Sequence, residues 1–383
     1  MKRILFALSA LALSTNAFAF PEMVRYGYTN CITCHVSPAG GGLLTPYGRQ
    51  ISAELLSHGK FFFEKGSSEP ESTKDESKEQ DFLYGLVPLP SWLNLGGDTR
   101  VLQYFQDNAY VEQAKFLLMQ ADLEAAATYN RVQLVAWGGI QYLPTYNSFG
   151  DYFISRDHWA SLLLGPQADL NRFQIRLGRF FPAYGLNIAE HTVITRQGLG
   201  FDQDDETYNF EASWIDDNIN LYLTSIFGRP DNPSLEQGLS FQAAVPVAET
   251  YKVGANVYTG LAPGAPINTR RYLAGTFAML GFTQSIYALA EVDGMYSQLN
   301  SSGLTDYVKL GDEVVQGLHF FVTQEFQRRT YLDPTQTYEA YGVGIQYFPR
   351  PHWDFLGTAE MQRDFAVSPL FGAALWAIVH YYL

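Results

Sequence analysis

Long apolar runs are missing from most of this chain. Between Leu83 and Leu383, no stretch approaches the roughly 20 consecutive apolar residues that a membrane-spanning helix needs. This absence excludes a bundle of transmembrane helices, although 47% of the residues are hydrophobic. The apolar residues must therefore be arranged in another pattern.

Cysteine is almost absent, because Cys31 and Cys34 are the only two in the chain. Two thiols cannot complete a four-ligand structural zinc site, and no βαβ pattern surrounds them as in a thioredoxin-type redox pair. They lie in the sequence C-I-T-C-H, which ends at His35 and matches the attachment signature of a c-type haem. Both thiols would form thioethers with the porphyrin, and His35 would ligate the iron from the proximal side. A disulfide stays open as an alternative, but it leaves His35 unexplained.

Positive charge is also scarce. The chain has 25 Lys and Arg residues against 39 Asp and Glu residues, which gives a net charge of −14. This balance argues against a nucleic-acid partner. Cations or basic proteins suit an acidic chain better.

Residues 1–19 have the pattern of a secretory signal peptide. Lys2 and Arg3 precede the short apolar core Ile4–Leu13, and Ala17–Ala19 fits an A-x-A cleavage site. A mature chain that begins at Phe20 has 23 basic residues against 39 acidic ones, and a net charge of −16. Export supports the haem prediction, because haem c is attached outside the cytoplasm.

Residues 20–63 are predicted to form a monohaem cytochrome c-like module around the motif. The run Pro38–Gly42 predicts a loop that wraps closely around something flat. Thr45 as N-cap and Pro46 as the first helical residue predict a helix that ends near Gly59.

The expected helix supplies a candidate for the distal haem ligand. Ile51, Leu55 and His58 would share one helix face, so that His58 could reach the iron. Met23 is the second candidate. A buried or capping role for His58, a five-coordinate iron, and a ligand from elsewhere in the chain all stay open.

Composition changes abruptly over residues 64–82. This stretch is rich in charge and serine, and it cannot bury enough surface to offset its ordering entropy. We interpret it as a disordered acidic linker.

Apolar and polar residues alternate repeatedly over residues 83–383. Such alternation fits a soluble β-protein, or a transmembrane barrel whose apolar face meets outer-membrane lipid. Segments of nine to twelve residues, aromatic residues at strand ends and an alternating run from Phe371 to Leu383 favour the barrel. We predict an all-β fold, an antiparallel transmembrane barrel of about 16 strands with 14 as the next choice.

One stretch between strands is unusually rich in glycine, aromatic residues and charge. It runs from Arg179 to Glu206 and includes His191. The pattern is like porin loops that shape a constriction, with Arg172 and Arg176 facing the lumen beside it. A solvated outer loop is the favoured interpretation, because barrel loops are often acidic. His191 with Glu190 is a candidate metal site.

The combination resembles the fused cytochrome–porins of the bacterial outer membrane. The matching residues are concentrated near the motif: Arg25-Tyr26-Gly27, Cys31, Cys34, His35, Pro38 and Leu44–Arg49. The resemblance implies electron transfer with a periplasmic electron carrier as partner, and ferrous iron or another extracellular metal ion as a donor. The Gly40–Gly42 loop and the acidic linker depart from the pattern of the iron oxidases.

Two functional hypotheses follow. In the first, the chain is primarily an electron carrier, and the module must plug the lumen because the apolar band of a barrel is about 25 Å tall. In the second, the barrel is a solute-conducting porin. Its haem module docks an electron carrier, acts as a sensor or gates the channel. A haem enzyme such as a peroxidase is a third interpretation.

The motif generates the first prediction. Protein from cells that mature c-type cytochromes should be coloured, with one haem per chain in the pyridine haemochrome assay. The double variant Cys31→Ser/Cys34→Ser should lose covalent haem on a denaturing gel, because both thioethers are removed. A colourless wild-type protein would refute the haem assignment.

Overall fold

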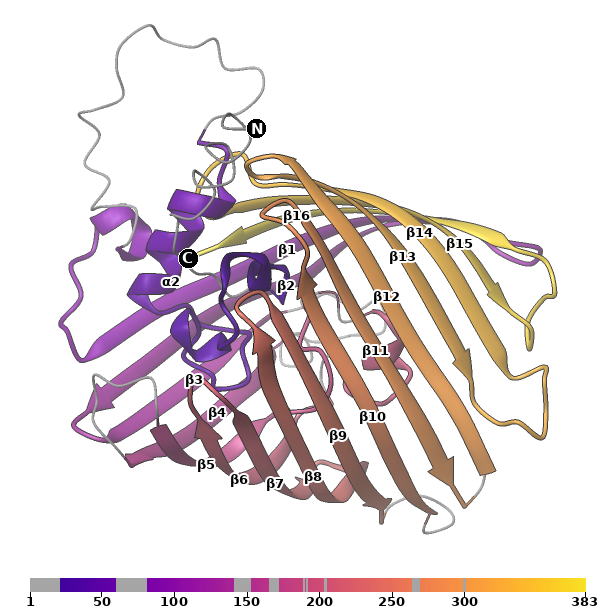
Figure 1. The fold of residues 1–383 in the computed structure, drawn as a ribbon, viewed down its shortest axis with the longest axis horizontal. Coiled ribbons are helices and arrows are strands. Elements are labelled where there is room, and N and C mark those ends of the chain that lie inside the picture. Colours follow the sequence, from indigo (N-terminus) through magenta and orange to yellow (C-terminus); the bar gives the residue numbers. More distant parts are fainter. Residues whose placement is uncertain are drawn as a thin grey trace, which may run out of the picture.

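The protein is a closed antiparallel barrel of 16 strands, in which β1 pairs with β16. The computed structural model describes residues 21–59, 81–140, 153–164, 172–188, 190, 192–202, 205–263, 269–298 and 301–383. The strands are β1 Leu93–Asp107, β2 Glu112–Tyr129, β3 Val132–Ile140, β4 Phe153–Leu164, β5 Arg172–Phe180, β6 Thr207–Ile215, β7 Asn220–Arg229, β8 Asn232–Ala248, β9 Tyr251–Ala262, β10 Thr269–Gly281, β11 Ile286–Ser297, β12 Ser301–Val315, β13 Leu318–Arg328, β14 Thr337–Tyr347, β15 Trp353–Asp364 and β16 Gly372–Tyr382. The predictions of a barrel and of 16 strands are confirmed (Figure 1).

Side chains alternate between the two faces of the wall. On the outer face, Leu177 and Val343 are 57% and 59% exposed, whereas their inward neighbours such as Arg176 are buried. This is the alternation of a barrel that presents apolar side chains to lipid and polar side chains to its lumen. No helix among the described residues has the length and apolar character needed to cross a membrane.

The two ends of the barrel differ in their connections. At the end where β1 begins and β16 ends, neighbouring strands are joined by short turns such as residues 316–317. At the other end, β5 and β6 are separated by residues 181–206. Bacterial outer-membrane barrels have short periplasmic turns and longer extracellular loops. We therefore refer to the end with short turns as the periplasmic mouth.

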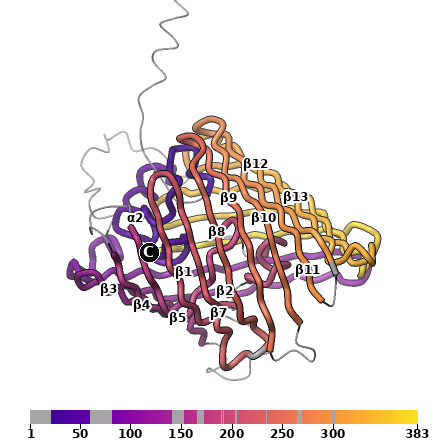
Figure 2. Tube along the Cα trace, turned by 60° about the horizontal axis from the view of Figure 1, so that its bottom comes forward, coloured from indigo at the N-terminus to yellow at the C-terminus, as the bar shows by residue number. Residues whose placement is uncertain are grey.

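The N-terminal segment lies in this mouth. Figure 1 and Figure 2 both place the indigo segment beside the C-terminal end of the chain, within the end of the barrel. Its elements are η1 Pro21–Tyr26, η2 Cys31–Thr33, α2 Pro46–Ile51 and η3 Ser52–Leu56. Helix η1 packs on β9, β10 and β11. A Cβ atom at Gly281 would lie 2.3 Å from Arg25 Cα, so glycine is needed where η1 meets the wall.

The helix after the motif begins as predicted and ends earlier than predicted. Thr45 caps α2 by accepting a hydrogen bond from Gly48 N, and Pro46 is the first helical residue. The last helical turn ends at Leu56, so that His58 lies beyond the helix, not on its face. The reason is tertiary: Gln316 Nε2 donates to the carbonyl oxygens of Glu54 and Ser57, which satisfies the end of the helix from the wall.

The connection between β5 and β6 turns into the lumen. Leu186 and Leu199 are 1% and 0% exposed, and the short helix α4 Ile194–Gln197 packs on β11, β12 and β13. The interpretation of this stretch as a solvated outer loop was wrong. Its apolar side chains can be buried only within the barrel lumen. Carboxylates on the lumen face of the wall also accept hydrogen bonds from its backbone amides. Glu291 accepts from Leu186 N at 2.9 Å, and Glu325 accepts from Ile194 N at 2.8 Å.

Several sequence predictions fall outside the described residues. They include the signal peptide 1–19, linker residues 64–80 and His191. Only the last two residues of the predicted linker, Asp81 and Phe82, are described, and Phe82 begins the short helix η5 Phe82–Gly85 that precedes β1. The domain boundaries stay predictions.

The outer face generates a stability prediction. Val343→Arg should lower the free energy of unfolding by about 2–4 kcal/mol, because the charge would lie near the middle of the bilayer. Chemical unfolding in lipid vesicles measures this change. The control Leu332→Arg changes a residue that is 81% exposed in the β13–β14 connection and should alter stability little. Equal losses in both variants would refute the lipid-facing assignment.

Candidate functional site

The C-x-x-C-H motif forms one tight turn. Cys34 N and His35 N both donate to the Cys31 carbonyl, at 3.2 and 3.0 Å. The chain then doubles back, and an isolated β-bridge joins His35 to Leu44. Thr45 N donates to the Cys34 carbonyl at 2.8 Å, which connects the motif directly to the N-cap of α2. The turn therefore holds both cysteines and His35 on one compact framework.

No disulfide joins Cys31 to Cys34. Cys31 is partly exposed, whereas Cys34 is 3% exposed and packs in a cluster with Met23, Ile51 and Leu56. The alternative of a disulfide between the two cysteines is not the state of this structure. Within the described ranges, no group of three or more His, Cys, Asp or Glu side chains is arranged to hold a metal ion.

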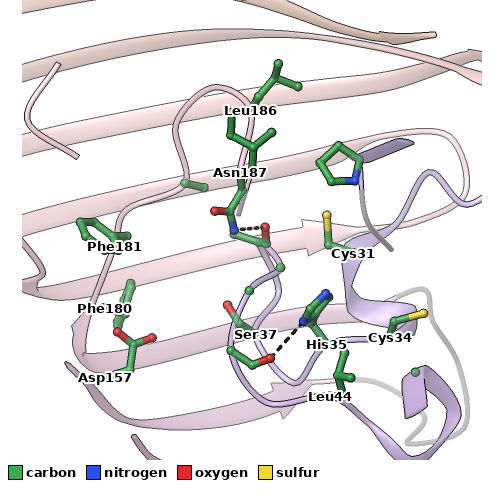
Figure 3. A pocket seen from close by; sticks show the side chains of 18 of the residues that line it. Cys31, Cys34, His35, Ser37, Leu44, Asp157, Phe180, Phe181, Leu186 and Asn187 are labelled. Atoms are coloured by element: carbon green, nitrogen blue, oxygen red, sulfur yellow. Dashed lines mark hydrogen bonds between the residues drawn. The ribbon is translucent and has the colours of Figure 1, made fainter. Parts of the chain in front are cut away.

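The orientation of His35 suits a ligand to haem iron. Its Nδ1 donates to the Gly42 carbonyl at 3.3 Å, as the dashed line in Figure 3 shows. Metal-ligating histidines usually donate their second ring nitrogen in this way, which fixes the ring orientation and raises its basicity. The iron ligand at this site would be Nε2.

The glycine loop holds the motif against the barrel. Gly40 and Gly42 have φ of +88° and +60°, a backbone conformation that disfavours other residues. A Cβ atom at Gly40 would lie 3.1 Å from Cys31 Cβ. The flanking carbonyl oxygens accept hydrogen bonds from the barrel interior: Asn187 Nδ2 donates to Ala39 O, and the Tyr222 hydroxyl donates to Pro38 O, each at 2.9 Å.

The stretch of residues 181–206 between β5 and β6, which turns into the lumen, is called the inward connection. A cavity of about 290 Å³ lies between the motif and this inward connection. Cys31, Cys34 and His35 line it from the module, and residues 180–188 line it from the β5–β6 side (Figure 3). The donor set fits a covalent haem, because two thiols outside any disulfide have the required spacing, Nδ1 of the adjacent imidazole donates to a carbonyl, and all three side chains line one cavity. The sequence predicted the motif, but it gave no sign that residues 180–188 would lie opposite it.

The two candidate distal ligands lie in different surroundings. Met23 is fully buried and packs beside Cys34. His58 donates from Nδ1 to the Gln316 carbonyl at 3.2 Å, and its ring lies 6.1 Å from that of Tyr347. Neither residue lines the cavity that the motif faces. The structure therefore brings Met23 to the motif but not His58, and distal ligation by either residue stays a prediction.

Sequence reasoning missed Lys252 as a contact of the motif. Its ammonium group extends from β9 and donates to the carbonyl of Thr29, just before Cys31. Lys252 also lines the cavity and is 4% exposed. The only available signal was its position on the polar face of an alternating strand.

Buried charges attach the module to the wall. Arg25 Nη2 donates to Glu313 Oε2 at 2.7 Å, and the Tyr26 hydroxyl donates to the same oxygen at 2.8 Å. The Arg25 and Glu313 side chains are 0% and 5% exposed. In such surroundings the two charges depend on each other, because removal of one leaves the other buried without a partner.

Lys309 joins three parts of the molecule. Its ammonium group lies 2.8 Å from Glu190 of the inward connection and 3.8 Å from Glu22 of the module. Burial raises the pKa of Glu22, despite the attraction of Lys309. Burial also raises the pKa of Glu190, but the attraction of the closer Lys309 ammonium group, together with its hydrogen bond, has the larger effect. The pKa of Glu190 is therefore lowered. Wall, module and inward connection therefore share one charged contact.

Helix α2 is attached to the start of the barrel. Arg49 Nη2 donates to Asn94 Oδ1 at 2.8 Å and also to the carbonyl of Leu95 in β1. Burial lowers the pKa of Arg49 to about 10, so the side chain remains charged at neutral pH. The Ser52 and Tyr382 hydroxyl groups lie 2.6 Å apart, which connects the following turn to β16.

Comparisons with solved structures identify the fold. OmpT of Vibrio cholerae is similar with a TM-score of 0.56 and 10% identity, over 76% of this chain and 97% of that one. An anion-selective porin from Comamonas acidovorans has a TM-score of 0.55 and 11% identity, over 76% and 99%. OmpF of Salmonella typhi, in complex with daunomycin, has a TM-score of 0.56 and 10% identity, over 76% and 97%.

These comparisons establish the fold and nothing finer. No protein-family model matches the chain, and no curated protein matches it. At about one-tenth identity, the structural likeness shows that this chain has the barrel fold of bacterial outer-membrane porins. The resemblance to a cytochrome depends only on the motif residues described above, because these comparisons do not test it.

The buried ion pair generates a prediction about the position of the module. Glu313→Ala should cost about 3–5 kcal/mol in chemical unfolding, because the Arg25 charge is left buried and unpaired. Limited proteolysis of the intact barrel should then cut within residues 21–59 faster than in the wild type.

A control keeps this test specific. Asp231 pairs with Arg229 at 3.1 Å, but its side chain is 70% exposed, so Asp231→Ala should change neither readout appreciably. If Glu313→Ala protected residues 21–59 as well as the wild type does, the ion pair would not be what anchors the module.

Proposed function

We propose that the chain is an outer-membrane electron-transfer protein that carries one c-type haem in the periplasmic mouth of its barrel. Cys31 and Cys34 would hold the haem covalently, and His35 would be the proximal ligand. The observation that supports this proposal is the position of the motif, which faces a cavity inside the barrel mouth. When bound, the haem supplies a centre that accepts and releases one electron.

The residues of this chain have three tasks in the proposed function. The motif turn holds the attachment thiols, while the Gly42 carbonyl orients the His35 ring. The buried pairs of Arg25 and Lys309 keep the module in the mouth. The residues at 180–188 close the cavity on the side away from the periplasm. Together they keep the site at one depth in the barrel mouth.

The depth of the module matters for transfer across the membrane. The apolar band of a barrel is about 25 Å tall, so a haem that hangs free in the periplasm would be separated from any external donor by that thickness. A module inside the mouth shortens the distance and remains beside the periplasm. A periplasmic electron carrier would be the partner on that side. An extracellular metal ion such as ferrous iron would be the electron donor, an assignment that depends only on the resemblance to cytochrome–porins.

The second candidate function is a solute channel whose haem module docks a carrier, senses or gates. The comparisons support this channel role more directly than they support electron transfer, because the matched structures include an anion-selective porin. The inward connection between β5 and β6 also narrows the lumen in the manner expected of a porin constriction. The two candidates differ in whether the site moves electrons or the lumen moves solutes.

Proteoliposomes separate the two functions. Vesicles that enclose methyl viologen are treated with external dithionite, and the absorbance of the reduced dye is followed. We expect rapid reduction with haem-loaded protein and at least about tenfold slower reduction with Cys31→Ser/Cys34→Ser, because only the first offers an internal redox centre. Equal rates in both would show that dithionite passes through the lumen, and would refute the electron-transfer proposal.

A further inference from the structure

Among the residues that the structure describes, Arg196 is a buried cation without an ionic partner. It belongs to α4 in the inward connection, lines the cavity that the motif faces, and is 7% exposed. Its side chain makes no hydrogen bond and no ion pair with any residue that the structure describes, and Nε is buried without an acceptor. A buried charge is costly unless another group compensates it.

The other cations that line this cavity all have partners. Arg156 lies 2.6 Å from Asp122, and Arg176 lies 2.7 Å from Glu211. Arg100 pairs with Asp98 at 3.2 Å, and Lys252 donates to the Thr29 carbonyl. Among the cations that line this cavity, the lack of a partner within the described residues is therefore particular to Arg196.

Aromatic rings and occupied acids surround the Arg196 guanidinium. Its Cζ lies 5.3 Å from the ring centroid of Phe181 and 6.0 Å from that of Phe201. The nearby acids have other partners, since Glu206 pairs with Arg179 at 2.9 Å and Glu291 accepts from Leu186 N. Burial lowers the pKa of Arg196, against the attraction of Glu291, Asp202 and Glu206. Ring contacts stabilise the charge but do not supply an acceptor.

We infer that Arg196 is the anchor of a carboxylate-binding site in the lumen cavity. The planar guanidinium fork matches the two oxygens of a carboxylate and binds them with two parallel hydrogen bonds. Phe181 and Phe201 provide apolar contacts for the organic part of such an anion. The carboxylate has two sources: a free organic anion in the lumen, or a propionate group of the haem at Cys31 and Cys34, which line the same cavity. Only the second source rests on the proposed function.

Binding of benzoate tests the site itself. Calorimetry on the purified full-length Cys31→Ser/Cys34→Ser barrel compares sodium benzoate with benzamide, its neutral analogue. We expect benzoate to bind, benzamide to bind at least about tenfold more weakly, and Arg196→Gln to abolish this preference. Arg196→Lys, which keeps the charge but loses the planar fork, should retain part of it. A preference for benzoate that survives in Arg196→Gln would overturn the inference.

Arg270→Gln is the matched control for loss of one positive charge. Arg270 lies exposed on β10, in the same barrel, and should leave benzoate binding unchanged. Heat-modified migration on gels verifies that each variant is a closed barrel. If Arg270→Gln weakened binding as much as Arg196→Gln, the effect would be one of net charge, and the site would be rejected.

The haem-loaded protein distinguishes the two sources. If a propionate is the ligand, benzoate should bind only to the haem-free barrel, and Arg196→Gln should lower the midpoint potential of the haem relative to Arg270→Gln. If a free anion is the ligand, benzoate should bind both forms and the potential should stay unchanged. The absence of benzoate binding from the haem-free barrel, together with an unchanged potential, would overturn the site. Failure to attach haem would refute the proposed function while the benzoate test still stands.

Discussion

The structure depends on one constraint, which is that backbone amide and carbonyl groups inside a bilayer have no water to bind. Each must be paired within the protein, and for strands only a closed barrel achieves this. Pairing of β1 with β16, for example Val101 opposite Val379, completes the closure. Because side chains alternate along each strand, the same closure turns one face to lipid and encloses the other. The polar lumen is thus a direct consequence of backbone pairing.

A polar lumen decides how anything inside it is held. The module of about 40 residues is too small to form a large core of its own. Its cluster around Met23 and Cys34 is completed by Phe348 from the barrel. Its charges are neutralised by Glu313 and Lys309, which project from β12. Module and barrel therefore stabilise each other, and the depth of the motif in the mouth is set by strand side chains.

The inward connection between β5 and β6 gives the site its second half. Without it, the motif would face an open lumen, whereas residues 180–188 enclose a cavity with it. Lys309 contacts both this connection, through Glu190, and the module, through Glu22. The arrangement links the proposed haem and the proposed carboxylate site at Arg196, because Cys31, Cys34 and Arg196 line one cavity. Electron transfer and solute passage would therefore compete for the same part of the lumen.

Local patterns were readable in the sequence, and partnerships across the barrel were not. The C-x-x-C-H motif, the Thr45 cap and the period-two alternation depend on residues close together in the chain, so the motif, the start of α2 and the 16-strand barrel could all be predicted. The helix ends at Leu56 where Gln316 of the barrel binds its last carbonyl groups. The β5–β6 connection, which carries Arg196, turns inward where Glu291 and Glu325 accept hydrogen bonds from its amides. All three barrel side chains are distant in sequence from the groups that they bind. Only closure of the barrel brings those groups together, and therefore only the tertiary structure decided them.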